Sequence, residues 1–106
     1  MKALSEHEVL DLLSDEMEGW ILENNTIRRD LKFSSFVNAF AFMTAVALEA
    51  EKMNHHPDWS NGYNRVSISL STHDANGITQ NDFDLAKVIN RINETFQQPL
   101  PAKVIP

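Results

Sequence analysis

Apolar and polar residues follow two different periods along this chain, and the change of period predicts its elements. Apolar residues recur at the three- and four-residue spacing of a helix in three segments, residues 5–16, 36–55 and 79–96. Strict alternation of apolar residues with serine marks residues 66–72 as a half-buried strand. Residues 20–23 and 27–33 predict two strands joined by a turn, and residues 58–63 are the expected hairpin partner of 66–72.

Capping residues lie at the predicted helix starts, and a proline limits the second helix. The caps are Ser5 with Glu8 in capping-box spacing, the Ser34-Ser35 pair, and Thr79 with Asp82 three residues on. His56 precedes Pro57 and is therefore disfavoured in α conformation. The second helix should accordingly end near His55.

Asparagine and glycine mark the predicted turns. The Asn24-Asn25 pair can join the first two strands, because asparagine tolerates the positive φ that a tight hairpin requires. The second hairpin has two competing turn signals, Asn61-Gly62 and Tyr63-Asn64. Residues 74–77 predict a loop, and the prolines of residues 97–106 predict an extended or disordered tail.

Two hairpins separated by a long helix predict a four-stranded antiparallel sheet. The apolar stripes of the helices need a face of that sheet to pack against. We therefore expect an α+β fold of order αββαββα, with three helices packed on one face. The length of residues 1–106 suits a single domain with a modest core.

The long helix over residues 36–55 is apolar on two sides. One side carries Phe36, Phe40, Met43 and Ala47, and a second strip carries Ala39, Phe42 and Val46. Both must be buried, one against the sheet and one against another subunit. We predict a homo-oligomer assembled through this helix, with the second strip in the interface. Burial of both strips in the core is the alternative.

Composition excludes several classes of function. The net charge of −6 and a pI of about 5.0 argue against a nucleic-acid partner, which would need a basic stripe. The chain has no cysteine, so neither a disulfide framework nor a thiolate zinc site can form. No apolar run is long enough for a signal peptide core or a membrane span. The cytoplasm is the default location.

The candidate chemistry lies in the histidines. Glu51 and His55 are four residues apart, hence neighbours on one helix face, whereas His56 aims its ring elsewhere. If the second hairpin turns at Tyr63-Asn64, His73 returns to the level of His55, and Asp82 follows in the first turn of the last helix. Imidazoles have a reference pKa of about 6.5, which suits proton transfer at neutral pH. The sequence therefore predicts an acid–base site.

Plainer interpretations compete for each of these residues. His55 alone could cap the helix carboxyl end, and Asp82 alone could be an ordinary acid at a helix amino end. The spacing of Glu51 and His55 also suits two metal ligands, but adjacent His55 and His56 cannot easily chelate one ion together. We favour a site without metal.

The full spacing of these residues resembles a known family. The motif is Glu51, His55-His56-Pro57, Tyr63, His73 and Asp82. Further similar segments are Gly19-Trp20, Phe36–Phe40, Phe42–Leu48 and Leu70–Asp74. Together they resemble the pterin-4a-carbinolamine dehydratases over about Leu12 to Phe96. Asn54, where relatives often carry an acid, and Asn76, where glycine is frequent, depart from the family pattern.

The resemblance implies an activity and a site. Family members convert 4a-hydroxytetrahydrobiopterin to quinonoid dihydropterin and water, in tetrahydrobiopterin recycling after aromatic amino acid hydroxylases, with no metal or redox cofactor. It implies acid–base roles for His55, His56 and His73 and orienting roles for Glu51 and Asp82. It also implies pterin contacts, made by Trp20, Pro57, Thr72, Asp74 and Ala75.

The resemblance also implies partners. Family members are homotetramers built partly through the long helix, and some animal members bind a homeodomain transcription factor with it. The alternative function is therefore a non-catalytic interaction protein that uses the apolar helix for a partner.

Overall fold

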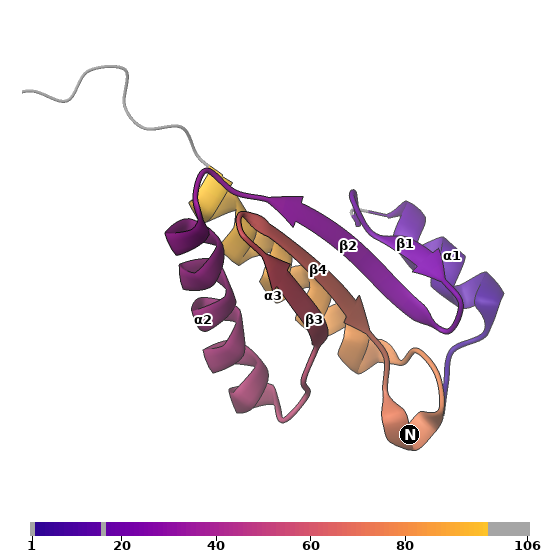
Figure 1. Ribbon diagram of the computed structural model, residues 1–106. Coiled ribbons are helices and arrows are strands. Elements are labelled where there is room, and N and C mark those ends of the chain that lie inside the picture. The colour runs from indigo at the N-terminus through magenta and orange to yellow at the C-terminus, as the bar shows by residue number, and fades with distance from the viewer. Residues whose placement is uncertain (1, 16, 98–106) are drawn as a thin grey trace, which may run out of the picture.

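The computed structural model describes residues 2–15 and 17–97. Its elements are, in order, α1 (Glu6–Ser14), β1 (Ile21–Glu23), β2 (Thr26–Lys32), α2 (Phe36–Met53), β3 (Asp58–Gly62), β4 (Arg65–Leu70), the 3-10 helix η1 (His73–Ala75) and α3 (Gln80–Gln97) (Figure 1). This order confirms the predicted αββαββα fold. Of the predicted tail over residues 97–106, only Gln97 is described, and it ends α3.

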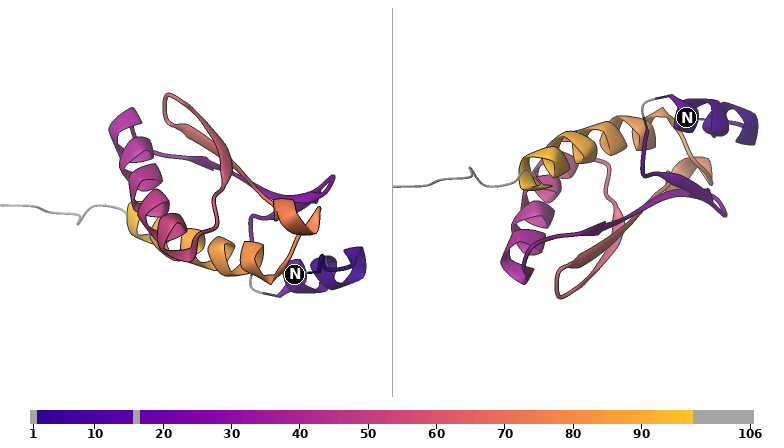
Figure 2. Two further views of the ribbon diagram at one scale, coloured as in Figure 1. Left: turned by 90° about the horizontal axis from the view of Figure 1, so that it is seen from below. Right: turned by 90° about the horizontal axis from the view of Figure 1, so that it is seen from above.

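The four strands form one antiparallel sheet in the order β1-β2-β4-β3. In the centre, Ile68 of β4 lies opposite Arg29 of β2 and Trp59 of β3. The views of Figure 2 place all three α-helices on one side of the sheet, with α1 near β1 and α2 near β3. The predicted packing of helices on a single face is therefore confirmed.

Capping side chains begin the helices as the sequence predicts. Ser5 and Glu8 form the complete capping box, with Glu8 Oε1 accepting from the Ser5 amide at 2.8 Å. Ser35 Oγ accepts from the Asn38 amide at 3.1 Å at the start of α2. These bonds satisfy amide groups that would otherwise have no partner within the first turn.

α2 ends at Met53, two residues earlier than the proline argument predicts. Asn54 adopts left-handed geometry with φ 51°, a conformation that asparagine tolerates better than most residues. The His55 amide still donates to the Ala50 carbonyl at 3.1 Å, although His55 itself has left the helix. The ring of His55 is therefore not on the same helix face as Glu51, which the spacing argument had assumed.

The second hairpin turns at Tyr63-Asn64, so the paired parts of its two arms are equal in length. Gly62 pairs with Arg65 directly before and after the turn. Tyr63 takes the positive φ, 50°, and the Asn61 side chain donates to the carbonyls of Tyr63 and Arg65. The competing turn at Asn61-Gly62 does not form. This register returns the end of β4 to the level of the α2 carboxyl end.

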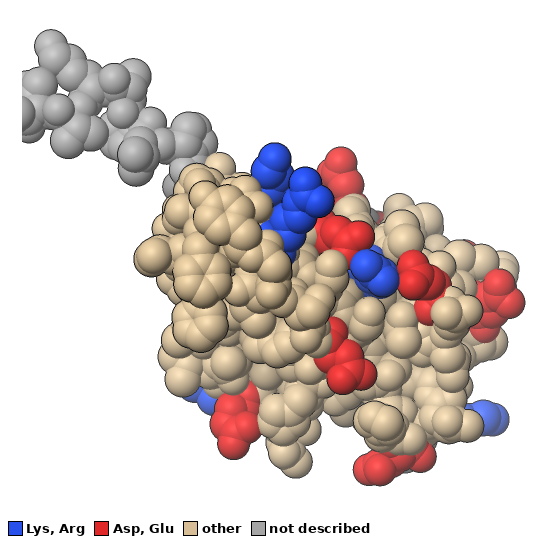
Figure 3. Space-filling view, in the orientation of Figure 1, with Lys and Arg blue, Asp and Glu red and all other residues tan. Residues whose placement is uncertain are grey.

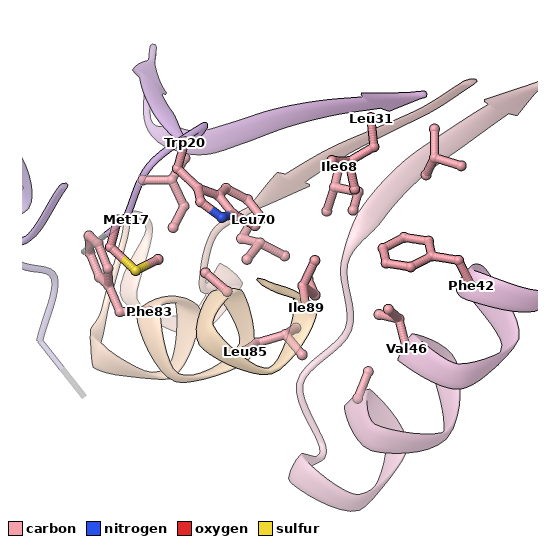
Figure 4. Close-up of a cluster of buried hydrophobic side chains, with 14 of the residues drawn as sticks. Met17, Trp20, Leu31, Phe42, Val46, Ile68, Leu70, Phe83, Leu85 and Ile89 are labelled. Carbon is pink, nitrogen blue, oxygen red and sulfur yellow. The ribbon is translucent and has the colours of Figure 1, made fainter. Parts of the chain in front are cut away.

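Side chains from the sheet and the helices fill the layer between them (Figure 4). Those fully buried include Ile27, Phe42, Val46, Val66, Ile68, Leu70, Phe83, Leu85 and Ile89. The last helix contributes Leu85 and Ile89 as predicted, with Ile92 and Phe96 packed partly against the same core. Burial of such side chains is the main favourable contribution to folding.

The prediction for the two strips of α2 was wrong in its assignment. Ala39, Phe42 and Val46 are fully buried in the chain's own core and cannot contact another subunit. The exposed apolar side instead carries Phe36, Val37, Phe40 and Leu48. A broad uncharged area covers α2 in the space-filling view, whereas acidic and basic side chains are dispersed over the rest of that face (Figure 3). Helical period alone could not tell which strip faces the sheet.

We predict that Val46→Ala lowers the free energy of unfolding by about 2 kcal/mol, because the truncation leaves a cavity in the core. Val37→Ala on the same helix is the matched control. Val37 is 72% exposed, so its loss should change stability by less than about 0.5 kcal/mol. Urea unfolding of both variants measures the difference, and equal effects would contradict the assignment of the buried side.

Candidate active site

Three segments meet where β4 ends. The first is the segment after α2, where His55 and His56 follow Asn54. The second is η1, which follows β4, and the third is the start of α3, where Thr79 directly precedes the first turn. The intervening loop is closed by hydrogen bonds between Thr72 and Gly77 in both directions, and Asn76 takes the left-handed conformation at φ 57°. Asparagine tolerates this conformation better than most residues, so it can stand where the family often has glycine.

A hollow of about 210 Å³ lies between these segments. Its walls are formed by Asn54, His55, His56, Ser71, Thr72, His73 and Asp74. The three histidines named from the sequence thus meet at one hollow, although His73 comes from a different part of the fold than the other two. The equal arms of the second hairpin are what bring them together.

His55 is paired with Asp82 in a buried hydrogen bond. The distance from His55 Nε2 to Asp82 Oδ1 is 2.5 Å, and the two residues are 9% and 0% exposed. The other oxygen, Asp82 Oδ2, accepts from the Thr79 amide at 2.8 Å and from the Thr72 hydroxyl at 2.9 Å. A buried carboxylate is tolerated when donors surround it in this way. Asp82 therefore links the start of α3 to both of the other segments.

His56 is paired with Glu51, which corrects the expectation that Glu51 acts on His55. The distance from His56 Nε2 to Glu51 Oε1 is 2.8 Å, and both side chains are largely exposed. The physical reason is the early end of α2, which moves His55 away from Glu51 and directs His56 back toward it. An exposed pair of this kind contributes little, about 0–1 kcal/mol.

His73 is exposed at the rim of the hollow, in the first position of η1. Its ring makes no hydrogen bond to another residue within 2–15 and 17–97. Its ring nitrogens are therefore open to a ligand or to solvent.

Trp20 lies away from this hollow. It is 5% exposed, among the core side chains, and its indole Nε1 donates to Asn90 Oδ1 at 2.7 Å (Figure 4). The same oxygen accepts from Arg29, whose pKa is lowered by partial burial. Trp20, directly before β1, and Arg29 of β2 are thus both bonded to Asn90 of α3. The position of Trp20 gives no support to the expected pterin contact.

The remaining ligand-contact candidates divide between the wall of the hollow and its surroundings. Thr72 and Asp74 line the hollow, whereas Pro57 and Ala75 are half-buried neighbours that are not part of its wall. Asn54 and Ser71 line it as well and were not named as site residues from the sequence. Thr79 was recognised only as a helix start, because its contact with Thr72 depends on the fold of the loop.

Two further properties concern the described part of the chain. No cluster of three or more His, Asp or Glu side chains within it is arranged to hold a metal ion. None of its helices is long and apolar enough to cross a membrane.

Comparison with known proteins assigns the family. The family model described as pterin 4 alpha carbinolamine dehydratase matches residues 2–92. This chain belongs to that family, as its motif indicated. A protein of Prochlorococcus marinus (strain NATL2A), provisionally named pterin-4-alpha-carbinolamine dehydratase, is 48% identical over 92 residues, which cover 87% of this chain and 97% of that protein.

Solved structures share the fold. The crystal structure of a transcriptional coactivator/pterin dehydratase from Brucella melitensis has a TM-score of 0.82 at 42% identity, covering 86% of this chain and 98% of that one. A pterin dehydratase-like protein described as a RuBisCO assembly factor in the alpha-carboxysome has a TM-score of 0.58 at 19% identity. That match covers 69% of this chain and 84% of the other, and it shows a common fold only.

We predict that Asp82→Ala lowers the free energy of unfolding by about 3 kcal/mol, because it leaves buried donors of His55, Thr72 and Thr79 without an acceptor. Asp84→Ala, two residues along α3, is the control. Asp84 is exposed and, among the described residues, its side chain accepts a hydrogen bond from Gln80 alone, so its loss should matter little. Denaturant unfolding distinguishes the two, and similar losses would show that the Asp82 network adds nothing to stability.

Proposed function

We propose that this chain catalyses the dehydration of 4a-hydroxytetrahydrobiopterin to quinonoid dihydropterin and water, as a step in tetrahydrobiopterin recycling. Membership of the family supports the reaction class. The observation that carries the proposal is the buried His55–Asp82 pair at the edge of a hollow that His56 and His73 also line.

The reaction needs an acid and a base on one substrate. The bond between carbon 4a and its hydroxyl oxygen breaks, and an acid gives that oxygen a proton to form water. A base takes the proton from the adjacent ring nitrogen, whose electron pair forms the new double bond to carbon 4a. Protons and electrons balance without an oxidant or reductant. Two imidazoles in opposite protonation states therefore suffice, each worth roughly 10²–10⁴ in rate.

The three histidines differ in their surroundings, and this difference suits a division of roles. His55 is buried against a carboxylate that can stabilise its protonated ring, as in other histidine–carboxylate pairs. His56 and His73 stand on the open side, where water can leave. We assign all three to the acid–base set, Asp82 to orienting His55, and Glu51 to His56. Contacts with the pterin fall to Asp74, with Pro57 and Ala75 beside it, and Thr72 lines the same hollow.

The proposal also covers the setting of the reaction. The substrate would come from an aromatic amino acid hydroxylase, and the location would be the cytoplasm, as expected from the sequence. The pocket residues themselves supply the proton transfers, so the chemistry requires no bound metal or redox cofactor.

We predict that His55→Ala and His56→Ala each lower the rate of dehydration at least tenfold, because each removes a positioned acid or base. Substrate generated by a hydroxylase, followed by absorbance of the dihydropterin, provides the assay. His7→Ala is the control, since His7 is exposed on α1 and pairs with Asp11. Wild-type rates in both site variants would refute the assignment.

We further propose that the chain forms a homo-oligomer, a dimer or tetramer, through the exposed apolar side of α2. Phe36, Val37, Phe40 and Ala41 surround one apolar depression on that side. Exposed apolar patches of this kind are costly in water and mark interfaces.

Phe40→Asp should reduce the mass of the particle in solution, because it places a charge in the proposed interface. Leu10→Asp on α1 is the control, because Leu10 is 48% exposed on a different helix. Light scattering at matched concentrations gives the mass. A mass unchanged by Phe40→Asp would place the contact elsewhere.

A second candidate function is a non-catalytic interaction protein. The exposed apolar side of α2 favours it. Such a protein would give no dehydration above the spontaneous rate. The wild-type assay therefore separates the two functions.

A further inference from the structure

We infer that Thr72 and Thr79 are positioning residues for His55, acting through Asp82. The Thr72 hydroxyl and the Thr79 amide donate to the Asp82 carboxylate, and the Thr79 hydroxyl is bonded to that of Thr72. The carboxylate held in this way fixes His55 in the tautomer that carries its hydrogen on Nε2. This leaves Nδ1 as the nitrogen that exchanges a proton with the substrate. The tautomer follows from hydrogen bonds alone, whereas the consequence for the reaction rate rests on the proposed function.

The hydroxyl hydrogens of the two threonines have a single consistent arrangement. Thr72 Oγ1 lies 2.9 Å from Asp82 Oδ2 and 2.7 Å from Thr79 Oγ1. A carboxylate oxygen can only accept, so the one hydroxyl hydrogen of Thr72 goes to Asp82. Thr79 must then donate to Thr72, while Thr79 Oγ1 accepts from the Asn81 amide at 3.2 Å. Both hydrogens are used within the network.

Matching donors with acceptors in the same way assigns the hydrogen between His55 and Asp82. Asp82 Oδ2 already accepts from two donors, and Oδ1 faces His55 Nε2 at 2.5 Å. Since the carboxylate has no hydrogen to give, Nε2 is the donor. The bond that one ring nitrogen makes sets which nitrogen carries the hydrogen.

His55 Nδ1 is then the nitrogen that faces the hollow. It makes no hydrogen bond to another residue of the described part of the chain. Within that part, no buried side-chain nitrogen or oxygen lacks a partner. Nδ1 is therefore not buried, and His55 lines the hollow, so this nitrogen is open to a ligand there.

Thr79 is 1% and Asp82 0% exposed, whereas Thr72 is half-buried in the wall of the hollow, so water reaches the carboxylate only from the side of Thr72. Without the Thr72 hydroxyl, Asp82 Oδ2 keeps only the Thr79 amide as a donor. The carboxyl group is then free to rotate, and once Oδ1 turns away the Nε2 hydrogen of His55 is no longer held. The wrong tautomer presents a hydrogen on Nδ1 and cannot accept a proton there.

This network also redefines Thr72, which the sequence had suggested as a pterin contact. Its hydroxyl hydrogen goes to Asp82, and its amide donates to the Gly77 carbonyl at 2.7 Å. Thr72 thus has no free hydrogen to donate to a substrate. Its effect on the reaction is expected through His55.

Thr72→Val is the sharper variant, because it removes the donor to Asp82 and leaves the α3 start intact. Thr79→Val would also remove the acceptor for the Asn81 amide. Thr72→Ser and Thr79→Ser restore the hydroxyls and should restore the wild-type behaviour. Thr44→Val controls for the substitution itself, since the Thr44 hydroxyl donates to the Phe40 carbonyl on the exposed side of α2.

The test is NMR of the imidazole nitrogens in the full chain labelled with ¹⁵N-histidine, recorded at a pH at which the imidazoles are neutral. The spectra show which ring nitrogen carries the hydrogen. Wild type, Thr72→Ser and Thr44→Val should show His55 with its hydrogen on Nε2. Thr72→Val should show a mixture of tautomers or a loss of the slowly exchanging Nε2 hydrogen. The kcat of Thr72→Val should be about tenfold lower than that of wild type, and its KM should stay within about twofold. A tenfold loss is part of the rate enhancement that a positioned acid or base provides.

Two results would overturn the inference. One is a wild-type His55 with its hydrogen on Nδ1, which decides the matter even if Thr72→Val does not fold. The other is a folded Thr72→Val chain whose His55 spectrum equals that of wild type. The expected spectra in a chain that does not accelerate dehydration would support the positioning role and refute the proposed function instead.

Discussion

The hydrogen bond between His55 and Asp82 is the interaction on which the site depends. It joins the carboxyl end of α2 to the start of α3, and the hydroxyl of Thr72 ties the loop after β4 to the same carboxylate. The three segments are far apart in sequence, so none could hold its side chains in place alone. A buried carboxylate without donors would be costly, which makes the arrangement strongly interdependent. A polar network of this kind fixes the geometry of the hollow as well as its chemistry.

Three different parts of α2 serve the core, the exposed surface and the site. One side buries Ala39, Phe42 and Val46 in the core, and the opposite side exposes Phe36 and Phe40. Asn54, the residue that follows its last turn, takes a left-handed conformation that turns the next two residues away from the helix. As a result His55 reaches the buried Asp82, while His56 turns back toward the exposed Glu51. Two adjacent histidines thus acquire different environments from a single backbone turn.

The sequence predicted the elements, the antiparallel sheet and the meeting of the histidines, because period, caps and turn residues are local properties. The capping box of Ser5 and the buried alternation of Val66, Ile68 and Leu70 are examples. It did not predict the partner of Glu51, because that depends on the left-handed turn at Asn54. It also misassigned the strips of α2, since both have helical period and only packing distinguishes them. Trp20 was placed at the ligand through family resemblance, whereas its indole is bonded to Asn90 inside the core.

The most direct test of the account is a double-mutant cycle on the dehydration rate, with Asp82→Asn, His55→Ala and the combination of both. If Asp82 acts through His55, the double variant should be no slower than His55→Ala alone, within about twofold. Independent effects that multiply in the double variant would show that the two residues do not act as a unit, and would contradict the central claim.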